Sequence, residues 1–301
     1  MTDPHELGRA CLERRRAGTV PGSGTPESVT DWQAFCVEAA LEAGATVRAS
    51  RARNLADLLA FKSDGSPATS IELDIERRLQ RHLSRFCPEA ALVAEELGGT
   101  LPPTGYAVAI DPIDGTWAFL SRTACASTTL VAIRDGTPFA AAVVNPATLE
   151  VVHASIERET ELIQVGALGV PDVLETLPLP QGAGRVLLSL QPSRRPEIVA
   201  AMAAAWARSE LGVVRSPGGS PAWALASAAK GAYTYANLWS NDPAAPYDLA
   251  AGALLVRAAG GEVVDLAGNP INSVCHRGPF VAGVEPAAVD RIRGLLCQAL
   301  G

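Results

Sequence analysis

Hydrophobic residues follow two periods along this chain, and each period predicts a different kind of element. Continuous apolar runs at 90–94 and 106–110 have the length of short buried strands. Between 71 and 86, apolar side chains recur every three to four positions and charges fill the other faces, which predicts an amphipathic helix. An Ala-rich segment that begins behind Thr30 and Asp31 predicts a long helix reaching about residue 59.

The middle of the chain predicts an antiparallel meander. Strand-like runs at 127–133, 139–144 and 150–154 are separated by turn-forming residues. A Pro- and Gly-rich stretch at 166–184 then precedes a second set of alternating strands and helices. We therefore expect a flexible N-terminal extension at 1–30, an N-terminal α/β half at 31–180 and a C-terminal α/β half at 181–301.

Two acidic pairs stand directly behind apolar runs. Glu95 and Glu96 follow the run at 90–94, and Asp111 and Asp114 follow the run at 106–110. Pro112 lacks the backbone N–H that a continuing central strand needs, so the strand is expected to stop at Asp111. Ligands bind outside the carboxyl ends of strands in open α/β sheets, so these acids are expected to converge on one crevice.

The residues behind the second acidic pair suit an anion. Gly115 lets the backbone approach a ligand closely, and a helix that starts there would direct free N–H groups toward it. Far along the chain, Asp248 stands at the head of a predicted helix that ends in a Gly-Gly pair. Asp248 alone would be an ordinary helix cap, and Glu95-Glu96 alone a solvated loop. Their combination predicts oxygen ligands that hold hard cations against a phosphate.

These motifs resemble the signatures of the magnesium-dependent inositol monophosphatase-like phosphatases. The segment Asp111-Pro112-Ile113-Asp114-Gly115-Thr116 matches the first signature of that family without a change, and Tyr247-Asp248-Leu249-Ala250-Ala251-Gly252 resembles the second. The resemblance covers residues 62–264. It implies an α/β fold, a layered αβαβα sandwich that is commonly a homodimer. It also implies a phosphoric monoester hydrolase in which metals bind the ester and an activated water cleaves it.

The resemblance further implies roles for individual residues. Two or three Mg²⁺ ions, or Mn²⁺ as a substitute, would be held by the side chains of Glu95, Asp111, Asp114 and Asp248 and by the carbonyl of Ile113. Thr116, paired with an acid that is Glu72 here, would position the attacking water. Glu96 would help to orient water on the metal.

Position 72 departs from the family pattern, which has Asp there. Glu is longer by one methylene, so its contact with Thr116 must be re-aimed, and a misplacement of about 1 Å can cost roughly a hundredfold in rate. An alternative is that Glu72 only forms salt bridges with arginines of its own helix. Many members of the family also have Asn two positions after the Gly-Thr, where this chain has Ala118, preceded by Trp117. This difference reshapes the substrate rim.

Substrate contacts are expected from Gly115, Thr116, Asp248, Gly219 and Ser220. The last two precede an Ala-rich helix that begins near residue 221, and a plain turn explains them equally well. The resemblance also suggests that Lys62 and Asp64 belong to a lid, although their segment also has the composition of a generic loop.

Composition sets limits on function. The chain has 301 residues, is 48% apolar and carries a formal charge of −7, which argues against binding a nucleic-acid polymer. No uninterrupted apolar stretch approaches the length that spans a membrane, and the N-terminus lacks the apolar core of a signal peptide. The six cysteines form no Cys-x-x-Cys motif and are interpreted as reduced thiols, so a cytoplasmic protein without a membrane partner is expected.

Three functions remain open at this point. The favoured one is Mg²⁺-dependent hydrolysis of a small phosphomonoester, with an inositol phosphate, another sugar phosphate or histidinol phosphate as substrate. A 3′(2′),5′-bisphosphate nucleotidase would use the same chemistry, but nucleotide-specific relatives often have Lys-Glu where Trp117-Ala118 stands. The third is a non-catalytic metal- or ligand-binding homologue. A covalent aspartyl-phosphate is not expected, because Asp111 and Asp114 are separated by two residues instead of one.

Overall fold

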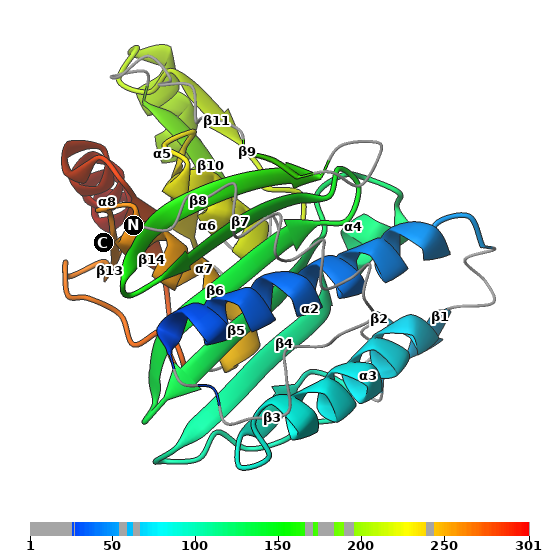
Figure 1. Ribbon diagram of the computed structural model, residues 1–301. Coiled ribbons are helices and arrows are strands. Elements are labelled where there is room, and N and C mark those ends of the chain that lie inside the picture. Colours follow the sequence, from blue (N-terminus) through cyan, green and yellow to red (C-terminus); the bar gives the residue numbers. More distant parts are fainter. Residues whose placement is uncertain are drawn as a thin grey trace.

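The protein forms five layers in the order helices, sheet, helices, sheet, helices (Figure 1). The computed structural model describes residues 26, 28–53, 59–62, 67–165, 171–173, 184–189, 196–238 and 244–300. Most of the expected extension at 1–30, and Asp64, lie outside these residues. The layers confirm the αβαβα sandwich. Of the helices in the described part of the chain, none combines the length and apolar character needed to cross a lipid bilayer.

The first layer consists of α2 (Val29–Ser50) and α3 (Ser70–Phe86), which cover the outer face of the larger sheet (Figure 1). The predicted amphipathic period of α3 is confirmed, because its apolar stripe is buried. The predicted limits of α2 were wrong at both ends. Ser28 is the cap, since its hydroxyl accepts a hydrogen bond from the Asp31 N–H at 3.2 Å. The helix ends at Ser50, where the buried face ends, and a short hairpin of β1 (Leu59–Phe61) and β2 (Pro67–Thr69) follows.

The larger sheet has seven strands in the order β3-β4-β5-β6-β7-β8-β9. Their bounds are β3 (Ala91–Ala94), β4 (Tyr106–Asp114), β5 (Ser127–Arg134), β6 (Thr137–Asn145), β7 (Glu150–Ser155), β8 (Arg158–Val165) and β9 (Pro171–Val173). β3 is parallel to β4, and every later pair is antiparallel, which confirms the predicted meander.

β4 does not stop at Asp111 as expected but continues through Pro112 to Asp114. Asp111 pairs with Thr129 and Asp114 pairs with Ser127, so β4 advances by three residues where β5 advances by two. The one extra residue on β4 makes a β-bulge, and a strand can accommodate a proline, which has no N–H to donate, at a bulge. The carbonyl of Pro112 accepts a hydrogen bond from the Thr128 hydroxyl at 2.7 Å.

The central layer contains α6 (Pro221–Ala229) and α7 (Pro246–Ala258), which lie between the two sheets. The smaller sheet has the order β11-β10-β12-β14-β13. Its strands are β10 (Arg185–Ser189), β11 (Val213–Arg215), β12 (Thr234–Asn237), β13 (Glu262–Asp265) and β14 (Phe280–Gly283), and its outer helices are α5 (Pro196–Ala207) and α8 (Pro286–Leu300). Leu187 faces α6 and α7, whereas its neighbours Val186 and Leu188 face α5 and α8.

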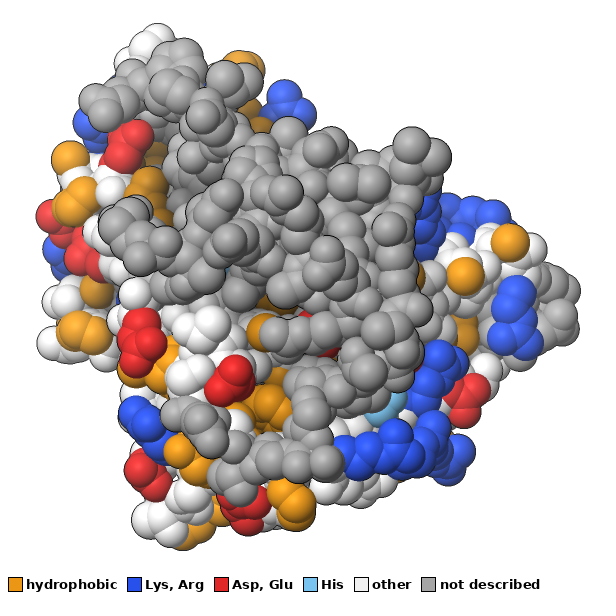
Figure 2. All heavy atoms as spheres, in the orientation of Figure 1, with side chains coloured by type: hydrophobic (Ala, Val, Ile, Leu, Met, Phe, Trp, Pro, Cys, Tyr) orange, Lys and Arg blue, Asp and Glu red, His pale blue; other side chains and the backbone are white. Residues whose placement is uncertain are grey.

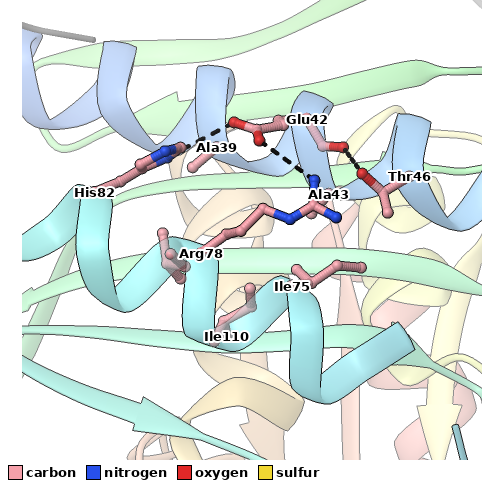
Figure 3. A pocket seen from close by; sticks show the side chains of 9 residues that line it. Ala39, Glu42, Ala43, Thr46, Ile75, Arg78, His82 and Ile110 are labelled. Atoms are coloured by element: carbon pink, nitrogen blue, oxygen red, sulfur yellow. Dashed lines mark hydrogen bonds and ion pairs between the residues drawn. The ribbon is translucent and has the colours of Figure 1, made fainter. Parts of the chain in front are cut away.

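Apolar packing holds α3 against the sheet, and ion pairs add little. Between α2 and α3, the Glu42 carboxylate lies 3.8 Å from Arg78 and 3.7 Å from His82 (Figure 3). These side chains are 25–44% exposed, and pairs of that kind contribute roughly 0–1 kcal/mol. The buried residues Ile75 and Ile110 lie beneath them and fix α3 over β4. On the face drawn in Figure 2, Lys and Arg side chains gather toward the side where α2 and α3 lie in Figure 1.

We predict that Gly252→Ala destabilises the protein. A Cβ at Gly252 in α7 would lie 2.5 Å from Cβ of Leu225 in α6, so the two helices must separate, and overpacking of this kind costs typically about 1–3 kcal/mol. Gly294→Ala in α8 is the matched control. No atom of the described residues outside the backbone of its own helix lies within 4 Å of a Cβ there, and Ala favours a helix interior over Gly by roughly 0.5–1 kcal/mol. Urea unfolding should show a lower midpoint for the first variant and an equal or higher one for the second. Equal midpoints in both variants would contradict the close packing of α6 and α7.

Candidate metal centre and active site

Acidic side chains from four separate elements meet at one edge of the larger sheet. Glu95 follows β3 directly, and Asp111 and Asp114 lie at the end of β4. Because β3 and β4 are parallel with Ala94 opposite Ile110, their carboxyl ends lie side by side. Glu72 comes from the first turn of α3 and Asp248 from the first turn of α7.

Glu72, Glu95 and Asp111 form the tightest acidic group. One carboxylate oxygen from each lies within 4.8 Å of the other two. Asp111 is held by a hydrogen bond from the Ile113 N–H to its Oδ1 at 2.8 Å. Three carboxylates at this spacing repel one another strongly in a buried site, so a cation at this point would relieve the repulsion.

Asp114 is fixed by donors from two distant segments. Its Oδ2 accepts hydrogen bonds from the Ser220 hydroxyl at 2.5 Å and the Ala222 N–H at 2.9 Å, both at the start of α6. The Ser127 hydroxyl lies 3.3 Å from the same oxygen. The sequence pattern predicts that Ser220 contacts the substrate, but in the structure its buried hydroxyl caps α6 and binds Asp114. A contact between Ser220 and substrate stays a prediction.

Gly115 and Gly219 bring two backbones together. Gly115 has φ +85°, and a Cβ there would lie 3.1 Å from the backbone of Gly219. Glycine is therefore required at position 115 for its backbone conformation and for the neighbouring loop. α4 (Thr116–Leu120) begins directly behind it, with Trp117 62% exposed.

Asp248 serves both as a helix cap and as a member of the site. Its Oδ2 accepts a hydrogen bond from the Ala245 N–H at 2.7 Å, which confirms the capping alternative. The charge of Asp248 also raises the pKa values of Asp111 and Asp114, so its carboxylate lies near these acids. The hydroxyl of Thr129 in β5 donates to the Tyr247 carbonyl at 3.1 Å and accepts a hydrogen bond from the Asp111 N–H at 3.4 Å. Thr129 thereby ties the start of α7 to the strand that carries Asp111.

The expected pairing of Thr116 with Glu72 is not formed by a hydrogen bond. The Thr116 hydroxyl donates to the Ile113 carbonyl at 3.2 Å. Glu72 accepts the N–H of Thr69 on its Oε2 at 2.5 Å. The roles of Thr116 and Glu72 in positioning water stay predictions.

Lys62 supplies positive charge beside the site. Its Nζ lies 2.6 Å from carboxylate oxygens of both Glu95 and Glu96. Burial lowers the pKa of Lys62, but these two carboxylates outweigh burial and raise it above its ordinary value. Glu76 supports the site although the sequence pattern did not predict a role for it. Its carboxylate accepts the N–H groups of Glu96 at 3.0 Å and Leu97 at 2.7 Å and so holds the turn behind β3. The position of Glu76 one turn after Glu72, on the same face of the helix, was the feature of the sequence that could have indicated this role.

Burial and mutual repulsion raise the pKa values of the acids. Burial, together with the charges of Glu95 and Glu96, raises the pKa of Glu72 to about 8 against the opposing effect of its hydrogen bonding with Thr69. Burial also raises the pKa of Asp114 to about 7 and that of Asp248 to about 6. The pKa of Asp111 lies well above its usual range, because of burial first and then of the charges of Glu95 and Asp114. The side chains that converge here all offer carboxylate oxygens, which fit Mg²⁺ or Mn²⁺ as ligands.

Comparisons with known proteins show what this chain is similar to. The model of the inositol monophosphatase family matches residues 28–298. The inositol-1-monophosphatase ImpA of Mycolicibacterium smegmatis is 28% identical over 256 residues, which cover 84% of this chain and 88% of that protein. A histidinol-phosphatase of Mycobacterium tuberculosis is 31% identical over 86 residues, which cover 29% of this chain and 33% of that protein.

The fold also resembles a solved structure. The extragenic suppressor protein SuhB of Bartonella henselae superposes with a TM-score of 0.70 at 21% identity, covering 87% of this chain and 96% of that one. At that identity the likeness supports the fold alone. The family match includes every acidic residue of the site, from Glu72 to Asp248. The chain therefore belongs to the inositol monophosphatase family, whose enzymes are metal-dependent phosphomonoesterases.

Proposed function

We propose that this phosphomonoesterase uses Mg²⁺ to hydrolyse a small phosphorylated metabolite, an inositol phosphate or another sugar phosphate. The observation that supports the proposal is the convergence of buried carboxylates that raise one another's pKa. Bound divalent cations would offset that charge, attract the phosphate and lower the pKa of a water molecule. Mn²⁺ would substitute, because it favours the same oxygen ligands.

We assign the following roles within this proposal. Two or three cations are held by Glu95, Asp111, Asp114, Asp248 and the carbonyl of Ile113. Ser220 and the N–H of Ala222 keep Asp114 oriented toward the cations. Thr116 positions the attacking water, and Glu96, held near Glu95 by Lys62, helps to orient it. Residues 31–180 supply most ligands, and 181–301 supply Asp248.

The alcohol half of the substrate would meet the rim formed by Gly115, Thr116 and the exposed Trp117. The relative named inositol-1-monophosphatase supports an inositol phosphate as the first substrate to test. The shorter match to a histidinol-phosphatase places histidinol phosphate in the same screen. Adenosine 3′,5′-bisphosphate tests the nucleotidase alternative.

We further propose that the protein is a cytoplasmic homodimer. Light scattering of the protein as it elutes from a size-exclusion column should then give twice the monomer mass.

We predict that phosphate release requires Mg²⁺ and is lost with EDTA. Asp111→Asn removes a charge from the tightest acidic group and should lower kcat/KM by more than about a hundredfold, since substitutions next to metal ligands already cost roughly 10- to 100-fold. Thr116→Ala should lower kcat more than it raises KM. Asp290→Asn, an exposed residue of α8, is the control and should leave the rate unchanged. Full activity in chelator would refute the proposed mechanism.

We also predict that the metal-free protein loses stability as the pH rises from 6 to 9. Carboxyls titrate near pH 4 in the unfolded chain, whereas Glu72 has a pKa of about 8 and Asp114 of about 7 in the folded protein. The folded state therefore binds more protons in this range, and its free energy of unfolding falls as the pH rises. Differential scanning fluorimetry in EDTA should show Tm falling by about 5 °C or more, because 1 kcal/mol shifts Tm by roughly 2–4 °C at this size. Added Mn²⁺ should flatten the dependence. A constant Tm in EDTA would contradict the repulsion.

A further inference from the structure

Glu72 has a buried carboxylate oxygen without a protein partner. The side chain is 0% exposed, and its Oε2 accepts the Thr69 N–H at 2.5 Å at the start of α3. This bond fixes the direction of the carboxylate. The other oxygen, Oε1, has no hydrogen-bond partner among the described residues. Leaving a polar oxygen buried in this way costs free energy unless another group binds it.

Apart from Thr69, two acids lie close to Glu72. The Glu72, Glu95 and Asp111 group has one oxygen of each residue within 4.8 Å of the others. Two oxygens that bind one Mg²⁺ at about 2.1 Å lie at most about 4.2 Å apart. Shifts of less than about 1 Å would therefore bring all three oxygens onto one ion of this size.

Glu76 shows what a structural carboxylate looks like on the same helix. It is also 0% exposed, but each of its oxygens accepts a backbone N–H, from Glu96 and from Leu97. Glu72 satisfies only one oxygen in this way. Its expected partner Thr116 donates to the Ile113 carbonyl instead. Helix capping and water positioning through Thr116 therefore leave Oε1 unexplained.

We propose that Glu72 binds a metal ion directly through Oε1, as a carboxylate ligand beside Glu95 and Asp111. The inference rests on the proposed metal-dependent function and adds a ligand from α3 to it. Compared with an Asp at the same position, the extra methylene of Glu72 supplies the reach. An Asp side chain anchored at the same backbone position ends about 1.5 Å short of this point.

The test is a titration with Mn²⁺ of the wild type and of Glu72→Gln, in which electron paramagnetic resonance measures the free ion. The Gln carbonyl can still accept the Thr69 N–H, so the helix start is kept, while the charged ligand is lost. We expect the Kd of one class of Mn²⁺ sites to rise by at least about tenfold. Asp74→Asn, an exposed carboxylate on the same helix, removes the same charge and should change the Kd by less than twofold. In EDTA, the Tm of Glu72→Gln should equal or exceed that of the wild type. If Glu72 only stabilised the fold, its replacement would lower the Tm.

An unchanged Mn²⁺ affinity in Glu72→Gln overturns the inference, and so does an equal loss in Asp74→Asn. If Glu72→Gln does not fold, Glu72→Asp keeps the charge with a shorter reach and should weaken the same class of sites, whereas wild-type affinity overturns the inference. The experiment uses the metal alone and is independent of hydrolysis. Weakened binding without hydrolysis of any phosphomonoester by wild type would refute the proposed function and leave Glu72 as a ligand. Mg²⁺-dependent hydrolysis with unchanged Mn²⁺ affinity would do the reverse.

Discussion

Repulsion among buried carboxylates is the constraint that the surrounding structure has to manage. Glu72, Asp111 and Asp114 are almost wholly buried, and each is held by at least one backbone N–H. Such bonds partly offset the cost of burial, but the raised pKa values show that repulsion and desolvation still dominate. Repulsion among these carboxylates therefore destabilises the fold at one edge of the sheet, and bound divalent cations would relieve it.

The five layers explain how acids so distant in sequence reach one place. β3 and β4 are parallel neighbours, so two acid-bearing turns emerge side by side without any long loop. α7 comes from late in the chain but packs against the larger sheet, with α6 beside it. The same two helices provide the donors for Asp114 and the position of Asp248. A central helical layer shared by both sheets is what makes the site a single unit.

Local patterns predicted the elements and the convergence of acids, whereas the contacts between segments could not be predicted. The period of α3 and the acids at the ends of β3 and β4 depend on nearby residues alone, so the sequence revealed them. The extension of β4 past Pro112 depends on a bulge against β5, and the start of α2 on which of several polar residues becomes the cap. The bonds of Ser220 to Asp114 and of Lys62 to Glu95 and Glu96 join segments far apart, and no spacing rule encodes them. The catalytic and metal roles of the site residues stay predictions.

The hydroxyl of Thr129 has a consequence for how this scaffold can change over evolution. One small side chain in the middle of a strand touches the backbone of Asp111 on one side and that of Tyr247 on the other. A shift of either segment would therefore be transmitted to its counterpart across a single oxygen atom. New specificities can arise through changes in the outer loops. Replacing the later part of the chain with that of a relative would also require the contact between Thr129 and the Tyr247 carbonyl to be kept.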